Sequence, residues 1–118
     1  THSKWLEFII NQIISNSIKY KKDKDSFIKL SVNDLPKQVD LHIIDNGVGI
    51  PAKDIGRVFE KTFTGENGRN SSKSTGMGLY IVKKLCGKLG HKIKVLSVQN
   101  EYTEVIISFS KDDFYKVR

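Results

Sequence analysis

The sequence lacks several features that would assign it to common protein classes. It has a single cysteine, Cys86, so it cannot form an internal disulfide, and with only three scattered histidines it has no cysteine-rich zinc site. It has no apolar run near the roughly 20 residues that a membrane span needs, and no signal-peptide profile at its start. We therefore expect a reducing compartment and no membrane crossing within these residues.

Motifs of the common nucleotide-binding and hydrolytic enzymes are also missing. The segment 68–74, GRNSSKS, lacks the second glycine of a phosphate-binding loop, and no G-x-G-x-x-G occurs. The signatures of eukaryotic-type protein kinases, G-x-S-x-G hydrolases and H-E-x-x-H metalloproteases are absent. These enzyme classes are excluded.

Positive charge is in excess, with 20 Lys and Arg against 13 Asp and Glu. A net charge of +7 suits nucleic acid, an anionic membrane or a phosphate-rich ligand. The densest lysine cluster, Lys19, Lys21, Lys22 and Lys24, is interrupted by Asp23 and Asp25, and no aromatic residues interleave with it at a stacking spacing, so we expect a solvated helix end and no nucleic-acid partner.

The length of 118 residues and the hydrophobic share of 38% predict one domain with a core over about residues 5–109 and a polar tail at 111–118. Periodicity predicts a largely buried helix over 5–18, a hairpin of strands 27–33 and 38–45, a short helix over 54–59, a helix following 76–78, and a second hairpin of strands 92–98 and 103–109. Residues 64–75 contain no apolar side chain, which predicts a mobile loop. The predicted fold is an α/β two-layer sandwich, with a mixed, mostly antiparallel sheet covered on one face by about three helices.

Polar residues stand at two places where the pattern predicts burial. Gln12, Asn16 and Lys19 fall within roughly a 60° arc of the first helix, which is typical of a cavity wall. Asp45 has the same strand parity as the core-facing Leu41 and Ile43, so its carboxylate points to the buried side and needs a partner there.

Four segments follow one another in a fixed order: NSIKY at 16–20, DNGVG at 45–49, VFEKTF at 58–63 and TGMGL at 75–79. Together they resemble the N, G1, F and G2 boxes of the ATP-binding domain of sensor histidine kinases. That domain has the Bergerat fold, which DNA gyrase, heat-shock chaperones of the ninety-kilodalton class and mismatch-repair ATPases share. The resemblance covers about residues 5–109 and implies that ATP and Mg²⁺ are the cofactors.

The chemistry of each segment fits such a ligand. The Asp45 carboxylate can accept a hydrogen bond from the adenine amino group, or it can simply form an Asx-turn. Asn16 offers an oxygen to Mg²⁺, and Lys19, the candidate catalytic residue, offers a point charge to phosphate; a satisfied core amide is the alternative for Asn16. The helix start at 76–78 presents free amides to phosphates, or serves only as a hinge.

The resemblance implies further nucleotide contacts. Gly47 and Gly49 would let the backbone pass under the base, unless they only shape a turn, and Tyr20 would flank the nucleotide, unless it is an ordinary packed tyrosine. The remaining implied ATP contacts are Ile50, Phe63, Thr64, Arg69, Gly76, Met77, Gly78, Leu79 and Thr103. Arg69 or Lys73 would supply a lid charge that the family often places just after the second aromatic residue of the F box, where this chain has Thr64.

Gln12 occupies the position at which hydrolytic relatives have a water-activating glutamate and most histidine kinases have asparagine. Glutamine is not a base but can still offer an oxygen to Mg²⁺, which favours phosphoryl transfer over hydrolysis. None of His2, His42 and His91 has the H-E-x-R-x-P context of an acceptor histidine.

The resemblance therefore implies transfer of the ATP γ-phosphoryl group to a histidine on a separate dimerisation domain, and onward to a response regulator. We expect a monomeric cytoplasmic fragment of a longer, membrane-anchored sensor kinase. Three alternatives stay open: a serine kinase of the anti-sigma type with the same fold, a non-catalytic nucleotide-sensing module, and a basic nucleic-acid-binding domain.

Overall fold

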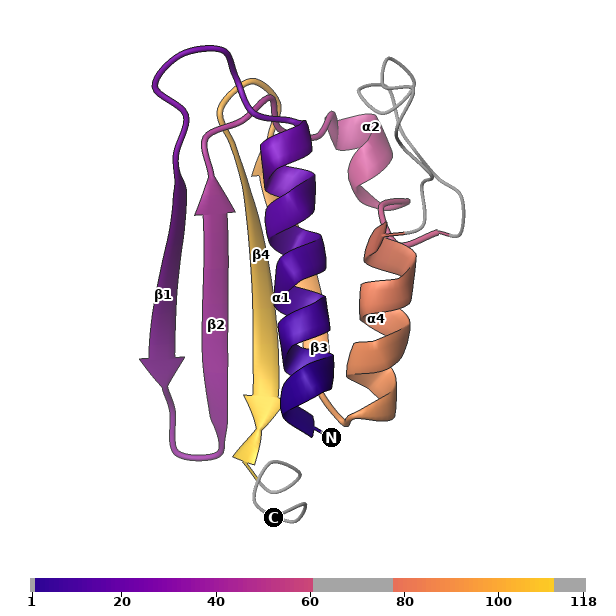
Figure 1. Cartoon of the computed structure of the whole chain (residues 1–118). Helices are drawn as coiled ribbons and strands as arrows, with labels where there is room; N and C mark the ends of the chain where they lie inside the picture. The colour runs from indigo at the N-terminus through magenta and orange to yellow at the C-terminus, as the bar shows by residue number, and fades with distance from the viewer. Residues whose placement is uncertain (1, 61–77, 112–118) are drawn as a thin grey trace.

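The structure, a computed structural model, describes residues 2–60 and 78–111. The elements follow the chain in the order α1 (His2–Lys19), β1 (Ile28–Asp34), β2 (Gln38–Asp45), α2 (Ala52–Ile55), α4 (Gly78–Lys88), β3 (Lys92–Val98) and β4 (Tyr102–Ser110) (Figure 1). The lid predicted at 64–75 lies outside the described residues, as does the polar tail predicted at 111–118 apart from Lys111. In the described part of the chain, no helix has both the length and the apolarity of a membrane span.

The four strands form one sheet in the order β1-β2-β4-β3. Both predicted hairpins are present, and they join where β2 pairs with β4. Every described strand pair is antiparallel, so the mixed sheet that the sequence led us to expect is purely antiparallel within these ranges. The register sets Asp45 opposite Thr103 at one end of the sheet.

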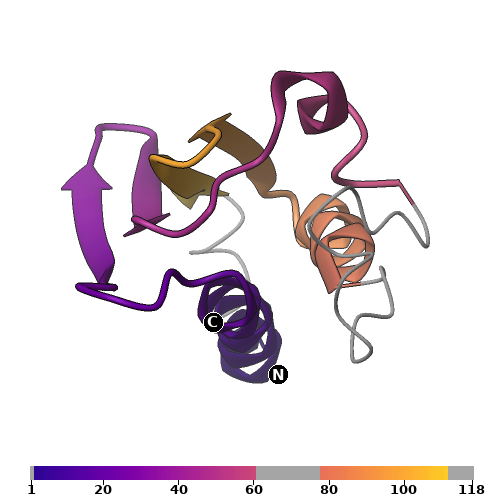
Figure 2. The same ribbon diagram turned by 90° about the horizontal axis from the view of Figure 1, so that it is seen from above.

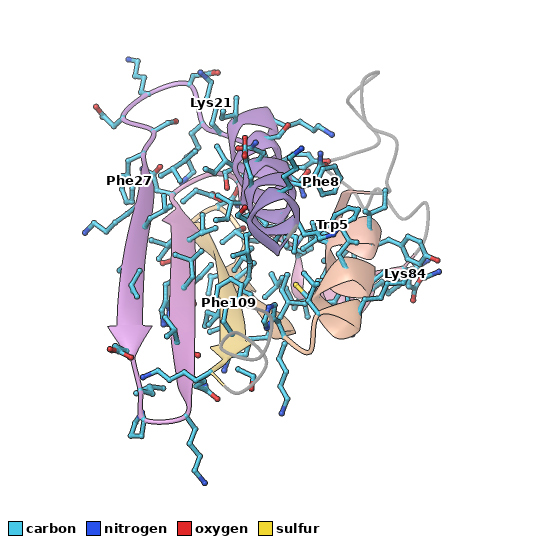
Figure 3. All side chains as sticks on the ribbon, turned by 60° about the horizontal axis from the view of Figure 1, so that its bottom comes forward. Trp5, Phe8, Lys21, Phe27, Lys84 and Phe109 are labelled. Carbon is cyan, nitrogen blue, oxygen red and sulfur yellow. The ribbon has the colours of Figure 1, made fainter. Side chains whose placement is uncertain are left out.

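Helices α1 and α4 lie beside each other on one face of the sheet, which gives the predicted two-layer sandwich (Figures 1 and 2). Alternate residues of the central strands point into this layer, as the period of two requires. The buried core cluster consists of Ile9, Ile13, Leu41, Ile43, Val82, Cys86, Val105 and Ile107. Phe109 packs against this cluster from β4, and its ring meets the buried His91 edge to face at 4.8 Å (Figure 3).

The expectation of a largely buried first helix is wrong. Ile9 and Ile13 are buried, but Trp5 is 46% exposed and Ile18 is 54% exposed. Trp5 and Phe8 project from α1 on the side of α4 (Figure 3). A helix that rests on one face of a sheet buries one stripe, so the high apolar density of this helix exceeds what the contact can cover.

The end of α4 has a specific cause in the sequence. Gly90 has a φ of +78°, its amide donates to the Gly87 carbonyl, and the His91 amide donates to the Cys86 carbonyl. This is the Schellman arrangement, which favours glycine at the left-handed position. The short helix α2 starts after Pro51 and ends at Ile55, earlier than the predicted range of 54–59.

Candidate functional site

Asp45 is the last residue of β2, and its side chain points into the helix-covered layer as predicted. The residue is 7% exposed. The Ser17 hydroxyl donates to Oδ2 over 2.8 Å, and the Gly47 amide donates to Oδ1 over 2.8 Å. The partner that a buried carboxylate needs is thus a serine on α1 that the sequence analysis did not single out; it follows Asn16 directly in the chain.

The bond from Gly47 to Asp45 makes an Asx-turn, the alternative that the sequence left open for this residue. This turn does not use all the hydrogen-bond acceptor sites of the carboxylate. An ionised aspartate has about four lone-pair sites, and the bonds to Gly47 and Ser17 use two of them. Asp45 therefore has acceptor capacity for a further donor.

Close backbone approach explains both glycines that follow Asp45. A Cβ on Gly47 would lie 2.6 Å from the Tyr20 carbonyl oxygen and 2.8 Å from Asp45 Oδ1. A Cβ on Gly49, whose φ is +70°, would lie 2.3 Å from the Val98 carbonyl oxygen. No larger side chain fits at either position without movement of the backbone, so the protein's own packing accounts for these glycines.

Three loops are joined around Val48 at this end of the sheet. The Val48 amide donates to the Tyr20 carbonyl over 3.0 Å, and the Asn100 amide donates to the Val48 carbonyl over 2.6 Å. Lys22 Nζ donates to the Asn100 carbonyl over 2.5 Å. The loop after β2 is therefore held between the end of α1 and the turn that joins β3 to β4.

Ile50 and Thr103, two predicted nucleotide contacts, are connected through Ser97 of β3. The Ile50 amide donates to Ser97 Oγ over 2.8 Å, and Ser97 donates to the Tyr102 carbonyl over 2.6 Å. The Thr103 hydroxyl lies 3.0 Å from Ser97 Oγ. Ser97 is a second residue that sequence reasoning missed, because nothing in a strand pattern marks one serine as a loop anchor.

Asn46 fastens the other side of the same loop. Its Nδ2 donates to the Asp25 carbonyl over 2.7 Å, and the Phe27 amide donates to its Oδ1 over 2.8 Å. Asp25 has a φ of +54°, a left-handed conformation that aspartate tolerates better than most residues. The segment before β1 and the segment after β2 thus support each other.

Gln12 and Asn16 lie together at the start of α4. A Cβ on Gly78 would lie 3.5 Å from Gln12 Oε1 and 3.8 Å from Asn16 Oδ1. The first amides of a helix have no partner within the helix, and its N-terminus carries partial positive charge. Two amide oxygens, the ligand type that Mg²⁺ accepts, therefore meet a helix start suited to anions, and Gly78 and Leu79 form that start.

Lys19 is the last residue of the same helix, and Tyr20 follows it. Lys19 is exposed, and its Nζ lies 5.8 Å from the centroid of the Tyr20 ring. Tyr20 is half-buried, and its carbonyl is the group that holds Val48. The predicted residues Phe63, Thr64, Arg69, Gly76 and Met77 lie outside the described residues.

Neither a metal site built from His, Cys, Asp and Glu side chains nor a cysteine nucleophile is supported in the described ranges. Residues 2–60 and 78–111 contain no cluster of three or more His, Cys, Asp and Glu side chains that could hold a metal. Burial raises the pKa of the Cys86 thiol to about 11, so Cys86 is a neutral core residue and not a nucleophile at neutral pH.

A buried aspartate with its glycine turn and two amide oxygens at a helix start lie together at this end of the molecule. These features agree with the family comparison. Residues 1–113 match the model of the histidine kinase-, DNA gyrase B- and HSP90-like ATPases, and the chain belongs to this family. Within it, the chain is of the catalytic, ATP-binding type found in sensor histidine kinases.

Sequence relatives support this narrower assignment. The sensor histidine kinase YxdK of Bacillus subtilis is 43% identical over 109 residues, which are 92% of this chain and 34% of that protein. The sensor histidine kinase GraS of Staphylococcus haemolyticus is 39% identical over 113 residues, which are 96% of this chain and 32% of that protein. The chain thus spans about a third of the length of these curated relatives.

Solved structures confirm the Bergerat fold. The mycobacterial sensor histidine kinase MprB superposes with a TM-score of 0.81 at 26% identity, over 92% of this chain and 73% of that chain. The catalytic domain of the histidine kinase ThkA superposes with a TM-score of 0.75 at 23% identity, over 92% of this chain and 68% of that chain.

Proposed function

We propose that this chain is the catalytic domain of a longer sensor kinase, binds ATP with Mg²⁺, and transfers the γ-phosphoryl group to a histidine of a separate dimerisation domain. The observation that supports this most is the arrangement of two consecutive residues of α1. Ser17 contacts the Asp45 carboxylate, and Asn16 faces the start of α4. One helical turn thereby links a purine-reading carboxylate to a phosphate-binding helix start.

Asp45 binds the base in this proposal. Its carboxylate is buried and held at both oxygens, and it can still accept a hydrogen bond from the adenine 6-amino group. Guanine carries a carbonyl oxygen at that position, which would face another acceptor and leave both unsatisfied. The turn at Gly47 and Gly49 brings the backbone close to this carboxylate, with the Tyr20 carbonyl beside Gly47 and Thr103 paired with Asp45, and Ile50 follows in the same loop.

The phosphates lie at the start of α4. Gly78 and Leu79 present helix amides, and Lys19 supplies a positive charge. The further ATP contacts in this proposal are Phe63, Thr64, Arg69, Gly76 and Met77. Asn16 and Gln12 would hold Mg²⁺, because both amide oxygens point to this helix start. When bound, Mg²⁺ supplies neutralisation of the phosphate charge and fixes the orientation of the γ-phosphoryl group.

These residues position the phosphates and do not activate water. Gln12 cannot remove a proton, so the site favours transfer to an external nucleophile over hydrolysis. A neutral imidazole is such a nucleophile and needs no base from this domain. We therefore expect slow turnover of ATP by the chain alone.

The acceptor histidine belongs to another domain. His42 Nδ1 is bonded to Glu104 over 2.8 Å, and His91 is 4% exposed against Phe109, so neither is presented to a nucleotide. The partners that follow are the histidine-bearing dimerisation domain of the same parent protein and a response regulator, and no nucleic acid. The domain would act as a monomeric unit on the cytoplasmic side of a membrane-anchored parent.

Two measurements test this function. Calorimetric titration with a non-hydrolysable ATP analogue should show binding that Mg²⁺ strengthens. Incubation of the chain with labelled ATP and the dimerisation domain of its parent should then yield an acid-labile, base-stable phosphoprotein. An acid-stable product would identify a serine kinase, and binding without transfer would identify a nucleotide-sensing module.

A further inference from the structure

The contact between Ser17 and Asp45 joins two elements far apart in the sequence. Ser17 is 8% exposed and Asp45 is 7% exposed, and their bond of 2.8 Å links the last turn of α1 to the end of β2. An ionised carboxylate only accepts hydrogen bonds, so the Ser17 hydroxyl must donate its one proton here. The Ser17 oxygen is then left with lone pairs alone.

We propose that Ser17 is a specificity-determining positioning residue that fixes the Asp45 carboxylate so that the pocket selects purine nucleotides with a 6-amino group. This inference rests on the proposed function, in which Asp45 reads the base. It adds a second residue whose removal should change the choice of base and not merely the strength of binding.

The first argument concerns the orientation of the carboxylate. The Gly47 amide holds Oδ1, and the Ser17 hydroxyl holds Oδ2, so the plane of the group is fixed at both ends. Without Ser17 only one oxygen is held, and rotation about the last side-chain torsion, which is soft for aspartate, is opposed by the Gly47 bond alone. A donor on the base would then meet an acceptor whose direction varies.

The second argument concerns the kind of hydrogen-bonding groups present. With its proton committed to Asp45, Ser17 contributes only acceptor lone pairs next to an acceptor-only carboxylate. A 6-amino group has two donors for such surroundings. A 6-oxo group has none, and burying it there would leave polar atoms unpaired.

The test compares two ligands that differ only at position 6 of the purine. Affinities for ATP and for purine riboside triphosphate, which carries hydrogen in place of the amino group, are measured with Mg²⁺ for the wild type and Ser17→Ala. Ser17→Thr keeps the hydroxyl, and Ser15→Ala, at an exposed position of the same helix, is the matched control. Thermal unfolding without nucleotide is recorded for every variant.

We expect the wild type to bind ATP about 10-fold or more tightly than the analogue, in line with a hydrogen bond to a charged group. Ser17→Ala should lower the affinity for ATP by about 5-fold or more and change the affinity for the analogue by less than about 2-fold. Ser17→Thr should restore most of the preference, and Ser15→Ala should keep all of it. If Ser17→Ala does not fold at the assay temperature, Ser17→Cys, with its weak donor, should give an intermediate preference.

An equal loss of affinity for both ligands in Ser17→Ala would assign Ser17 a structural role and overturn the inference, as would an unchanged preference. A wild type that binds ATP and the analogue equally would instead remove the base-reading role of Asp45, and the inference with it. The wild-type ratio therefore separates failure of the proposed function from failure of the role of Ser17.

Discussion

Asp45 and Thr103 lie directly opposite each other across β2 and β4, where the two hairpins of the sheet meet. This pairing brings the loop after β2 to the turn between β3 and β4, although more than 50 residues separate them in the sequence. Both side chains share the face that carries Ile43 and Val105 of the core. The position of the candidate site is thus a consequence of strand order.

Gly49 should be the glycine that tolerates substitution least. Gly49→Ala places a Cβ 2.3 Å from the Val98 carbonyl at a φ of +70°, and we expect it to lower the free energy of unfolding by about 2 kcal/mol or more. Gly87→Ala is the control, because a Cβ there meets nothing within 4 Å, and it should raise stability by up to about 1 kcal/mol. Denaturant titration of both variants measures this, and equal effects would refute the packing explanation.

Asn16 should matter for the metal-dependent part of nucleotide binding. In Asn16→Ala, we expect the gain in affinity for an ATP analogue on addition of Mg²⁺ to be lost, because an oxygen at the start of α4 is removed. Asn11→Ala changes an exposed asparagine of the same helix and should keep the full gain. A normal gain in Asn16→Ala would show that this oxygen is not a ligand.

Lys19 should act on the phosphates and not on the base. We expect Lys19→Gln to weaken binding of an ATP analogue by about 5-fold or more and to leave adenosine binding unchanged, because only the triphosphate carries the charge that Lys19 meets. Lys21→Gln, at the neighbouring exposed lysine, is the control for overall charge. Similar losses in both variants would indicate long-range charge alone.

Cys86 should make the protein less stable at alkaline pH. Its thiol pKa rises from 9.0 to about 11 on burial, so above pH 9 the unfolded chain releases a proton that the native protein keeps. The contribution of the neutral Cys86 thiol to stability is therefore fully present below pH 9, and the free energy of unfolding should fall by about 2 kcal/mol as the pH approaches 11. Cys86→Ala has no thiol to ionise, so its free energy of unfolding relative to the wild type should improve from pH 8 to pH 11. If the difference in free energy of unfolding between the two proteins stays constant over this range, the raised thiol pKa is contradicted.

Much of the fold could be predicted from local pattern. Strand alternation identified both hairpins, and the ranges 38–45 and 92–98 agree with β2 and β3 to the residue. The buried position of Asp45 followed from its parity with Ile43, because a strand alternates strictly. The helix expected after residues 76–78 is α4, and its Val82 and Cys86 lie in the core.

Other features depended on tertiary contacts that no local pattern contains. The exposure of Trp5 reflects the single face on which α1 packs, and apolar density alone cannot show that face. Ser17 and Ser97 were missed because their roles come from partners in distant elements, Asp45 and Ile50. A serine within a periodic segment looks the same whether it is solvated or anchors a loop.

The most direct test of the account is calorimetric titration of a non-hydrolysable ATP analogue, with Mg²⁺, into the wild type, Asp45→Asn and Asp40→Asn. Asp40 lies on the same strand with opposite parity, so it controls for loss of one negative charge. We predict that Asp45→Asn weakens binding by about 10-fold or more and that Asp40→Asn binds as the wild type does. Binding by Asp45→Asn that equals the wild type would contradict the central claim that this buried carboxylate reads the adenine base.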